Sequence, residues 1–327
     1  MKAVYISEFG GAEKLEIREI PEPPKPRGSQ VLVNVKAAGL NRADLLQRRG
    51  AYPPPAGISP NIPGLEFAGE VTEIGDLVTN FKSDDRVFGI TAGEAQAEYL
   101  LTDERVIARI PENLSFVEAA AVPEVFITAH DAVFSQCGLQ PNEWLLIHAV
   151  GSGVGLAALQ LAKTHNARVL GTSRTQQKLD RCAEFGLDAA ILISEPKFAD
   201  IVDRETGGMG ANIILDLVGA AYFQENLKSI AKKGRIVLVG TTSGSKVEFD
   251  LGIAMSKRLR LIGTVLRARS IDEKAEATRK FADEVVPLLV SGQVRPNVDR
   301  VFPVEEVQAA HRYLESNESF GKVVLEF

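Results

Sequence analysis

The chain has few of the residues that build disulfide frameworks and zinc lobes. Its 327 residues include only two cysteines, Cys137 and Cys182, and four histidines. Two cysteines cannot form the four-cysteine lobe of a structural zinc site. No two histidines have the spacing of a metal-binding motif. We therefore expect reduced thiols in a cytoplasmic protein and exclude a secreted, disulfide-stapled scaffold.

The chain also lacks excess positive charge and an uninterrupted apolar segment. Its formal net charge is −6, and an acidic surface repels phosphate backbones and anionic lipid. Residues 144–162 approach the length of a membrane span, but Gly151, Gly153 and Gly155 in their middle would weaken a spanning helix. Charges throughout the first twenty residues argue against a signal peptide. We therefore expect neither nucleic acid nor a membrane as a partner.

Two kinds of pattern are present along the sequence. Residues 1–122 hold short β-branched segments bounded by Gly, Pro, Asn or Asp, which predict strands and turns. From residue 123, apolar runs alternate with helical segments, which predicts an α/β domain with a parallel, doubly wound sheet. Residues 266–327 are expected to return to the first domain. The predicted domains are thus 1–122, 123–265 and 266–327.

Individual elements follow from the same patterns. The expected strands of the parallel sheet are 144–150, 167–173, 189–193, 212–218, 235–240 and 259–265. Helices are expected at 41–50, where Gly50 would end the helix, and at 272–290 and 305–316. A final strand is expected at 322–327.

A glycine-rich turn follows the first strand of the parallel sheet. Small residues let a diphosphate approach the backbone and leave the amides at a helix N-terminus free to bind it. The match to GxGxxG is imperfect, because serine takes the second glycine position. The flanking strand and helix favour a dinucleotide site over a plain glycine-rich turn. The residues concerned are Gly151, Ser152, Gly153, Val154 and Gly155.

The next strand ends at Ser173, which is followed by Arg174 and, one turn later, Lys178. A site specific for NAD usually has an acid near this position, about 20 residues after the loop, to bind the ribose 2′-hydroxyl. No carboxylate occupies 171–179. A 2′-phosphate would be held by the three side chains, which favours NADPH over NADH. The alternative is that Arg174 and Lys178 are solvated charges at a helix start.

The order of these motifs resembles the quinone oxidoreductase branch of the medium-chain dehydrogenase/reductase superfamily, over nearly the whole length. It is most similar to the branch with serine in the nucleotide loop, known in animals as tumour-suppressor-inducible. The segments that carry the resemblance are AAGLNRADLLQRRGAYP (37–53), PGLEFAGEV (63–71), PEVFITAHDAV (123–133), LLIHAVGSGVG (145–155), ILDLVG (214–219), GRIVLVG (234–240) and GKVVLE (321–326).

The resemblance implies a Rossmann cofactor domain from the middle of the chain and a mostly β, GroES-like substrate domain from both ends. It places the active site in the cleft between them. It also implies a homodimer that pairs edge strands of two cofactor domains, with 258–265 as that strand.

The resemblance also bears on zinc. Relatives that oxidise alcohols hold a catalytic zinc, and the matching positions here are Asn41, Leu65 and Glu124. Leucine has no lone pair for a metal, and asparagine is a poor zinc ligand. Without a Lewis acid, alcohol oxidation is disfavoured and electrophilic acceptors remain. We therefore expect a zinc-free enzyme.

Three polar residues are candidates for the chemistry near the acceptor. Tyr52 lies in a proline-rich loop and can offer its hydroxyl, Asn41 offers an amide donor, and Asp44 is expected to orient neighbours such as Asn41. Each has a structural alternative: a loop cap for Tyr52, a turn for Asn41 and a helix cap for Asp44. Glu66 matches a family acid beside the cleft, although a lone strand acid is more often structural.

Further positions are assigned to the cofactor by the resemblance. Thr128 matches a position near the nicotinamide, with a backbone-bonded hydroxyl as its alternative. Backbone groups around Gly240 and Leu266 are candidates for the carboxamide. Arg267 and Lys322 match family positions that reach the cofactor from its far side, with a solvated surface charge as the alternative for each. Asn317 stands where some relatives carry an arginine for the adenine phosphate, so that pocket depends more on Lys178 and Arg174.

The predicted function is reduction of a quinone by NADPH. The reaction is either a one-step hydride transfer or one that forms the semiquinone overall. Reduction of an α,β-unsaturated carbonyl compound requires the same parts and additionally a proton donor to carbon. A non-catalytic NADPH-binding protein, with a structural or RNA-contacting role, is the alternative from another class. The net acidity of the chain argues against it.

Overall fold

The computed structural model describes residues 1–327, which form two compact units. One contains Met1–Ile127 together with Leu266–Phe327, and the other contains Thr128–Val265. The first boundary lies within helix α3 (Pro123–His130), five residues after the expected one. None of the helices combines the length and the apolar character that crossing a membrane requires.

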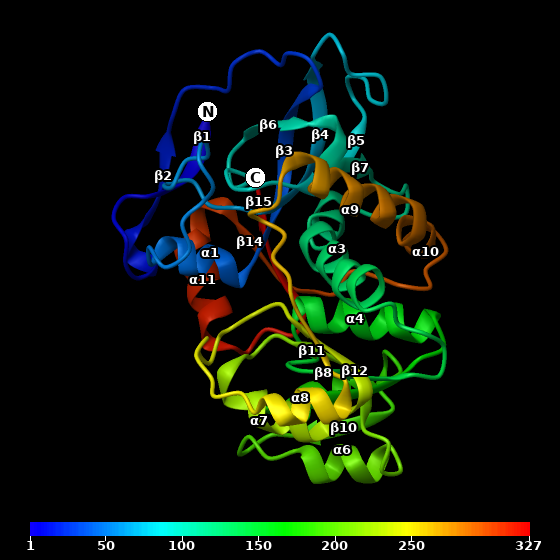
Figure 1. Ribbon diagram of the computed structural model, residues 1–327. Coiled ribbons are helices and arrows are strands. Elements are labelled where there is room, and N and C mark those ends of the chain that lie inside the picture. The colour runs from blue at the N-terminus through cyan, green and yellow to red at the C-terminus, as the bar shows by residue number, and fades with distance from the viewer. The chain divides into compact units, whose positions relative to one another are not determined.

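The unit Thr128–Val265, coloured from green to yellow in Figure 1, is built on a six-stranded sheet. Every strand pairing in this sheet is parallel. In spatial order its strands are β10 (Ala189–Leu192), β9 (Arg168–Ser173), β8 (Trp144–Ile147), β11 (Ala211–Asp216), β12 (Ile230–Leu238) and β13 (Arg260–Gly263). The predicted doubly wound Rossmann architecture is confirmed. The chain leaves β8 toward β9 and later returns to β11 on its other side, so the carboxyl ends of β8 and β11 form the switch point where such sheets bind ligands.

Helices connect these strands. They are α4 (Gly153–Thr164), α5 (Gln176–Ala183), α6 (Ala199–Glu205), α7 (Ala220–Ser229) and α8 (Leu251–Lys257). All four residues of β8 are buried, as a central parallel strand covered on both faces requires. Leu146, Ile214 and Ile236, from neighbouring strands, belong to one core cluster with Phe198 and Phe223. The core therefore holds the carboxyl ends of the strands in fixed register.

The other unit contains a mostly antiparallel sheet. Its strand order is β14 (Val298–Pro303), β15 (Lys322–Glu326), β3 (Gln30–Leu40), β4 (Glu66–Ile74), β5 (Arg86–Ile90) and β7 (Ile107–Arg109), and β6 (Tyr99–Asp103) also pairs with β3. A separate ribbon joins β1 (Lys2–Ile6) to β2 (Leu15–Glu19). Because β15 pairs with β3, the end of the chain lies inside the sheet formed by its beginning. This mostly β architecture is the expected GroES-like one.

Helices of this unit begin with α1 (Arg42–Arg48) and α2 (Phe116–Ala119), and end with α11 (Val307–Ser316). The helix expected at 272–290 is two helices, α9 (Ile271–Glu284) and α10 (Val286–Val290). Pro287 explains the break, because proline has no N–H for the carbonyl of Asp283 and its ring crowds that carbonyl. Strands β6, β7 and β14 and helix α8 were not expected from the sequence.

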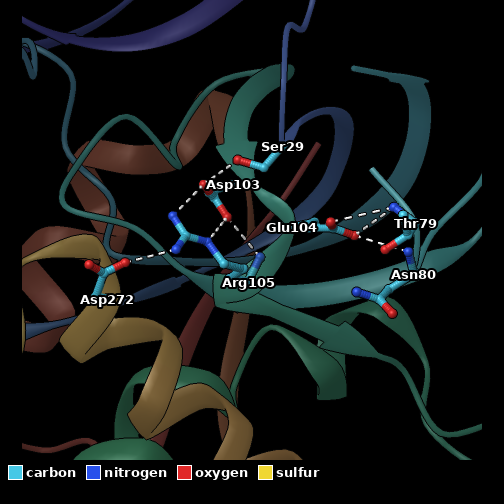
Figure 2. A network of polar contacts seen from close by, with 7 residues as sticks. All are labelled: Ser29, Thr79, Asn80, Asp103, Glu104, Arg105 and Asp272. Carbon is cyan, nitrogen blue, oxygen red and sulfur yellow. Dashed lines mark hydrogen bonds and ion pairs between the residues drawn. The ribbon is translucent and has the colours of Figure 1, made fainter. Parts of the chain in front are cut away.

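A polar network joins α9 to the turn after β6 (Figure 2). Arg105 donates from Nη1 to Asp272 over 2.8 Å and from Nε to Asp103 over 2.9 Å. The neighbouring carboxylate of Glu104 is buried and accepts the backbone amides of residues 79 and 80. Since Arg105 and Asp272 are exposed, their ion pair contributes little stability and mainly fixes the position of the α9 N-terminus.

Candidate functional site

The glycine-rich turn joins β8 to α4 in the unit Thr128–Val265. Ser152 is the N-cap of α4, and its hydroxyl oxygen accepts the amide of Gly155 over 3.2 Å. The amides of Gly153 and Val154 have no partner within the chain. They lie at the positive end of a 12-residue helix. This helix end offers unused donors to an anionic group.

Gly155 is required by close packing of this helix on the turn. A Cβ atom at this position would lie 2.6 Å from the carbonyl oxygens of both Ala149 and Val150. Backbone atoms cannot yield to such a contact. Glycine at this position therefore allows α4 to begin directly above the end of β8, as the third glycine of a dinucleotide motif does.

The end of β9 lacks acidic side chains. Ser173 is its last residue and is buried, Arg174 is exposed, and Lys178 is half-buried in the first two turns of α5. The first turn of α5 contains no acid. A phosphate at this strand end would meet a hydroxyl and two cations, and no carboxylate that repels it.

Two further predicted positions belong to this unit. Thr128, in α3, is half-buried, and its hydroxyl makes no hydrogen bond to the helix backbone, so the backbone-bonded alternative is wrong. Gly240 follows β12, and its amide donates to the carbonyl oxygen of Asp216 over 3.3 Å. A Cβ atom at Gly240 would lie 2.9 Å from the carbonyl oxygen of Leu217. Gly240 thus holds two strand ends close together.

A second polar cluster lies in the other unit, around a buried ion pair. Lys322 and Glu66 are 4% and 0% exposed, and Nζ lies 2.5 Å from Oε1. The ammonium group also donates to the carbonyl oxygen of Leu40 over 2.6 Å and to Oδ1 of Asn41 over 2.8 Å. All three N–H bonds of Lys322 are therefore directed at oxygen atoms. The solvated-charge alternative for Lys322 is wrong.

Asn41 and Asp44 extend this cluster. Nδ2 of Asn41 donates to Oε1 of Glu66 over 2.9 Å. Asp44, which has no exposed surface, accepts the amide of Asn41 over 2.7 Å and that of Gly64 over 3.0 Å. Burial raises the pKa of Asp44 to about 6, although the two amide hydrogen bonds oppose the shift. Asp44 thus starts helix α1 and at the same time fixes the backbone of Asn41.

Glu124 adds a third acid to the cluster. Its backbone amide donates to Oε2 of Glu66 over 2.9 Å. Burial, and then the negative charge of Glu66, raises the pKa of Glu124 to about 8. A carboxyl group in this position keeps its proton at neutral pH. Sequence reasoning considered Glu124 only as a metal ligand, because a raised pKa depends on neighbours distant in sequence.

Tyr52 is held by Arg267, which is also a buried cation. The guanidinium lies 5.0 Å from the centre of the Tyr52 ring, and Nη1 donates to the Tyr52 carbonyl oxygen over 3.0 Å. Its other donors reach Ala92 over 2.7 Å and the side chain of Gln47. Arg267 is 4% exposed, so the solvated-charge alternative is wrong for it as well. The Tyr52 hydroxyl has no partner within the chain, and burial raises its pKa.

The remaining predicted positions have local roles. Leu266 is buried, and its carbonyl oxygen accepts the amide of Arg269 over 3.2 Å. Asn317 ends α11 in the left-handed conformation, with φ 64°. Its side chain accepts a hydrogen bond from Arg42 and donates one to the carbonyl oxygen of Glu315.

The donor set of the cluster does not fit zinc. Leu65 is buried and apolar, and Oδ1 of Asn41 accepts a hydrogen bond from the Lys322 ammonium. No group of three or more His, Cys, Asp or Glu side chains is arranged to hold a metal ion. A divalent cation here would also be repelled by Lys322. The side chains at these three positions therefore do not form a set of ligands that fits zinc.

Comparisons with known proteins show the family of the chain. Residues 27–132 match the Alcohol dehydrogenase GroES-like domain, and residues 153–283 match the Zinc-binding dehydrogenase family. The quinone oxidoreductase-like protein 2 of Mus musculus is 32% identical over 96% of this chain and 89% of its own length. The quinone oxidoreductase of Homo sapiens is 29% identical over 99% of this chain and 97% of its own length.

A solved structure supports the same assignment. The quinone oxidoreductase of Escherichia coli, solved in complex with NADPH, superposes with a TM-score of 0.90 at 29% sequence identity, covering 100% of both chains. Similarity of this extent spans both units and includes the glycine-rich turn. The chain belongs to the quinone oxidoreductase family of the medium-chain dehydrogenase/reductase superfamily.

Proposed function

We propose that the protein is an NADPH-dependent oxidoreductase that transfers hydride to quinones without zinc. The observation that carries the proposal is the pair of unused amides at Gly153 and Val154, beside a strand end that holds Arg174 and no acid. Amides at a helix start bind a diphosphate, and the acid-free strand end accepts a 2′-phosphate. The NADPH complex of the Escherichia coli relative supports the choice of cofactor.

Each part of the cofactor has proposed partners in the chain. The turn 151–155 would hold the diphosphate, and the 2′-phosphate would contact Ser173, Arg174 and Lys178. Thr128 and the backbone near Gly240 and Leu266 would border the nicotinamide. When bound, NADPH supplies the hydride. The protein contributes orientation of the reactants and exclusion of water.

On the acceptor side, we propose that Tyr52 donates a hydrogen bond to the oxygen that gains negative charge. Its hydroxyl has no partner within the chain, and its raised pKa keeps the proton on it at neutral pH. Asn41 and Asp44 are proposed to act with it. Because the Asn41 amide is bonded to Glu66 and Lys322, its role is positional unless substrate displaces one of these partners.

The zinc-free character is also a proposal, and it follows from the donor set. In the zinc enzymes of this superfamily a Lewis acid lowers the pKa of the alcohol before hydride leaves, whereas a quinone accepts hydride without that step. The Lys322 ammonium, held between Glu66 and Asn41, supplies a fixed positive charge in this part of the chain. Metal analysis of protein purified without chelators should find no stoichiometric zinc.

Reduction of α,β-unsaturated carbonyl compounds is a second candidate, and one observation favours it. Glu124 keeps its proton near neutral pH, and reduction of a carbon–carbon double bond requires a proton for carbon in addition to hydride. Quinone reduction delivers its protons to oxygen, where solvent can supply them. The Tyr52 hydroxyl, which has no partner within the chain, is the other candidate source of this proton, so Tyr52→Phe should reduce turnover of an enone more than turnover of a quinone.

The test is a comparison of NADPH and NADH oxidation with ortho-quinones, para-quinones and enones. We expect the highest kcat/KM with NADPH and a quinone. Preference for NADH would contradict the phosphate contacts, and fast enone turnover with no quinone turnover would favour the second candidate. Tight NADPH binding with no turnover of any acceptor would favour a non-catalytic role. Arg174→Glu should raise the KM for NADPH and leave that for NADH nearly unchanged.

We further propose a homodimer that forms through β13. This strand is at the edge of the six-stranded sheet and has unpaired backbone groups along one side. Leu251, Met255 and Leu261, from α8 and β13, are exposed apolar residues beside it. In such a dimer, the β13 strand of the partner would pair with these backbone groups and cover these apolar side chains. We also propose a cytoplasmic location, since Cys137 and Cys182 are free and buried.

A further inference from the structure

A chain of buried hydrogen bonds joins the carboxyl ends of β8, β9 and β11 in the unit Thr128–Val265. His148, Thr172, Asn226 and Asp216 are its members, and none has any exposed surface. The two ring nitrogens of His148 lie 3.1 Å from Oγ1 of Thr172 and 2.7 Å from Oδ1 of Asn226. Nδ2 of Asn226 donates to Oδ2 of Asp216 over 2.9 Å.

The direction of every bond follows from the chemistry of the groups. The carboxylate of Asp216 only accepts, so the amide nitrogen of Asn226 faces it and the amide oxygen faces His148. Nε2 of His148 must then carry the proton, and burial lowers the pKa of His148, so the ring is neutral. Its Nδ1 therefore accepts the hydroxyl proton of Thr172. Donors and acceptors are matched along the whole chain, which strengthens each bond.

The first donor of this chain belongs to the glycine-rich turn. The amide of Ala149 donates to Oγ1 of Thr172 over 3.3 Å. Ala149 has a φ of 50°, a left-handed conformation that residues with a Cβ atom rarely adopt. Its carbonyl oxygen accepts the amide of Ser152 over 2.9 Å, which closes the turn at the start of α4. The Thr172 hydroxyl thus supports the one strained residue of the turn.

The other end of the chain reaches the loop after β11. Oδ1 of Asp216 accepts the amides of Val218 and Gly219, each over 2.8 Å. The backbone carbonyl of Asp216 accepts the amide of Gly240 after β12. The buried bonds therefore connect the glycine-rich turn to two further loops at the carboxyl edge of the sheet. Ligands of open parallel sheets bind at this edge.

The stability of the core does not require these polar side chains, because apolar side chains of similar volume stabilise a core at least as well. We propose that Thr172 and His148 are positioning residues, which hold the Ala149 turn so that the amides of Gly153 and Val154 face the diphosphate of the dinucleotide. This inference rests on the proposed function, since it concerns how the same site is kept ready for its cofactor.

The test uses Thr172→Val, which removes the hydroxyl at nearly constant volume, and Thr172→Ser, which restores it. Dissociation constants for NADPH are measured by fluorescence, and melting temperatures are measured without ligand. Loss of one buried hydrogen bond to the turn should raise the Kd of Thr172→Val about tenfold, and Thr172→Ser should remain within about twofold of wild type. Thr172→Ala removes the same hydroxyl and replaces Thr172→Val if that variant does not fold.

The matched control lies at the opposite ends of the same strands. Oδ1 of Asn212, at the start of β11, accepts the amide of Trp144, at the start of β8, over 2.9 Å. Asn212→Ala should lower the melting temperature and leave the Kd for NADPH unchanged. A wild-type Kd in Thr172→Val, or an equal rise in Asn212→Ala, would overturn the positioning role while leaving the proposed function intact. Wild-type protein that binds no NADPH would overturn both.

Discussion

At the scale of single residues, Glu124 should make stability depend on pH. Its pKa is about 8, above the ordinary value of 4.5, so between these values the folded chain keeps a proton that the unfolded chain has lost. Stability therefore falls as pH rises from 4.5 through 8, and the loss is complete above that range. Glu124→Gln removes this loss. We expect the variant to melt above wild type at pH 9, with the difference vanishing near pH 4.5.

Melting curves of wild type, Glu124→Gln and the exposed control Glu112→Gln at several pH values measure this effect. Asp44, whose pKa is raised to about 6, shifts stability with the same sign. It does so in all three proteins, so its contribution cancels in their differences to a first approximation. A gap between Glu124→Gln and wild type that widens toward acid pH would contradict the burial of this acid.

The ion pair of Glu66 and Lys322 provides a second prediction at this scale. Lys322→Met would leave a carboxylate with no exposed surface without its cation. Removing one partner of a buried pair costs about 3–5 kcal/mol. The double variant Glu66→Gln with Lys322→Met should recover most of this loss, because no charge then stays unpaired. Urea unfolding of wild type, of Lys322→Met, of Glu66→Gln and of the double variant measures the four free energies of unfolding. Additive losses would show that the two residues do not act as a pair.

Single residues were also where sequence reasoning reached its limit. Gly155 and Ser152 were predictable because a strand, a turn and a helix follow one another within a few residues. The contact between Glu66 and Lys322 joins positions 256 residues apart in the sequence. No local sequence pattern indicates such a contact. For Arg267 the alternative of a solvated surface charge stayed open for the same reason, since its partners Tyr52 and Ala92 are far away in sequence.

At the scale of elements, the start of α4 is open to test. The Ser152 hydroxyl accepts the Gly155 amide, and Ser152→Ala should cost about 1 kcal/mol of stability, as loss of an N-cap usually does. The hydroxyl proton is free to reach a phosphate, so the Kd for NADPH should rise several-fold. Ser115 caps α2 with the same geometry. Ser115→Ala should therefore cost similar stability without weakening NADPH binding, and equal Kd values in both variants would contradict the phosphate contact.

Elements were predictable where burial imposes a period on the sequence. The parallel strands were found because both of their faces are buried, so they appear as continuous apolar runs. Strand β14 was missed because its burial is mixed, and four of its six residues are exposed or carry charge or proline. The break between α9 and α10 was missed although Pro287 signals it, because the apolar pattern continues through the proline.

At the scale of the whole molecule, the proposed homodimer depends on the sheet edge formed by β13. Leu261 is 41% exposed on this edge, and its backbone neighbours have partners only on the β12 side. If two copies pair there, the particle has twice the chain mass of 35.4 kDa. A lysine on an edge strand disfavours pairing, because its charge would be buried between strands. Leu261→Lys should therefore sediment as a monomer.

The opposite edge of the same sheet supplies the control. Leu192 ends β10, which pairs only with β9, and is 49% exposed. Leu192→Lys adds the same charge to the same sheet and should remain dimeric. The glycine-rich turn and Ser173 belong to one chain's own unit, so the Leu261→Lys monomer should bind NADPH with nearly the wild-type Kd. Dissociation caused by Leu192→Lys and not by Leu261→Lys would place the interface on β10 instead.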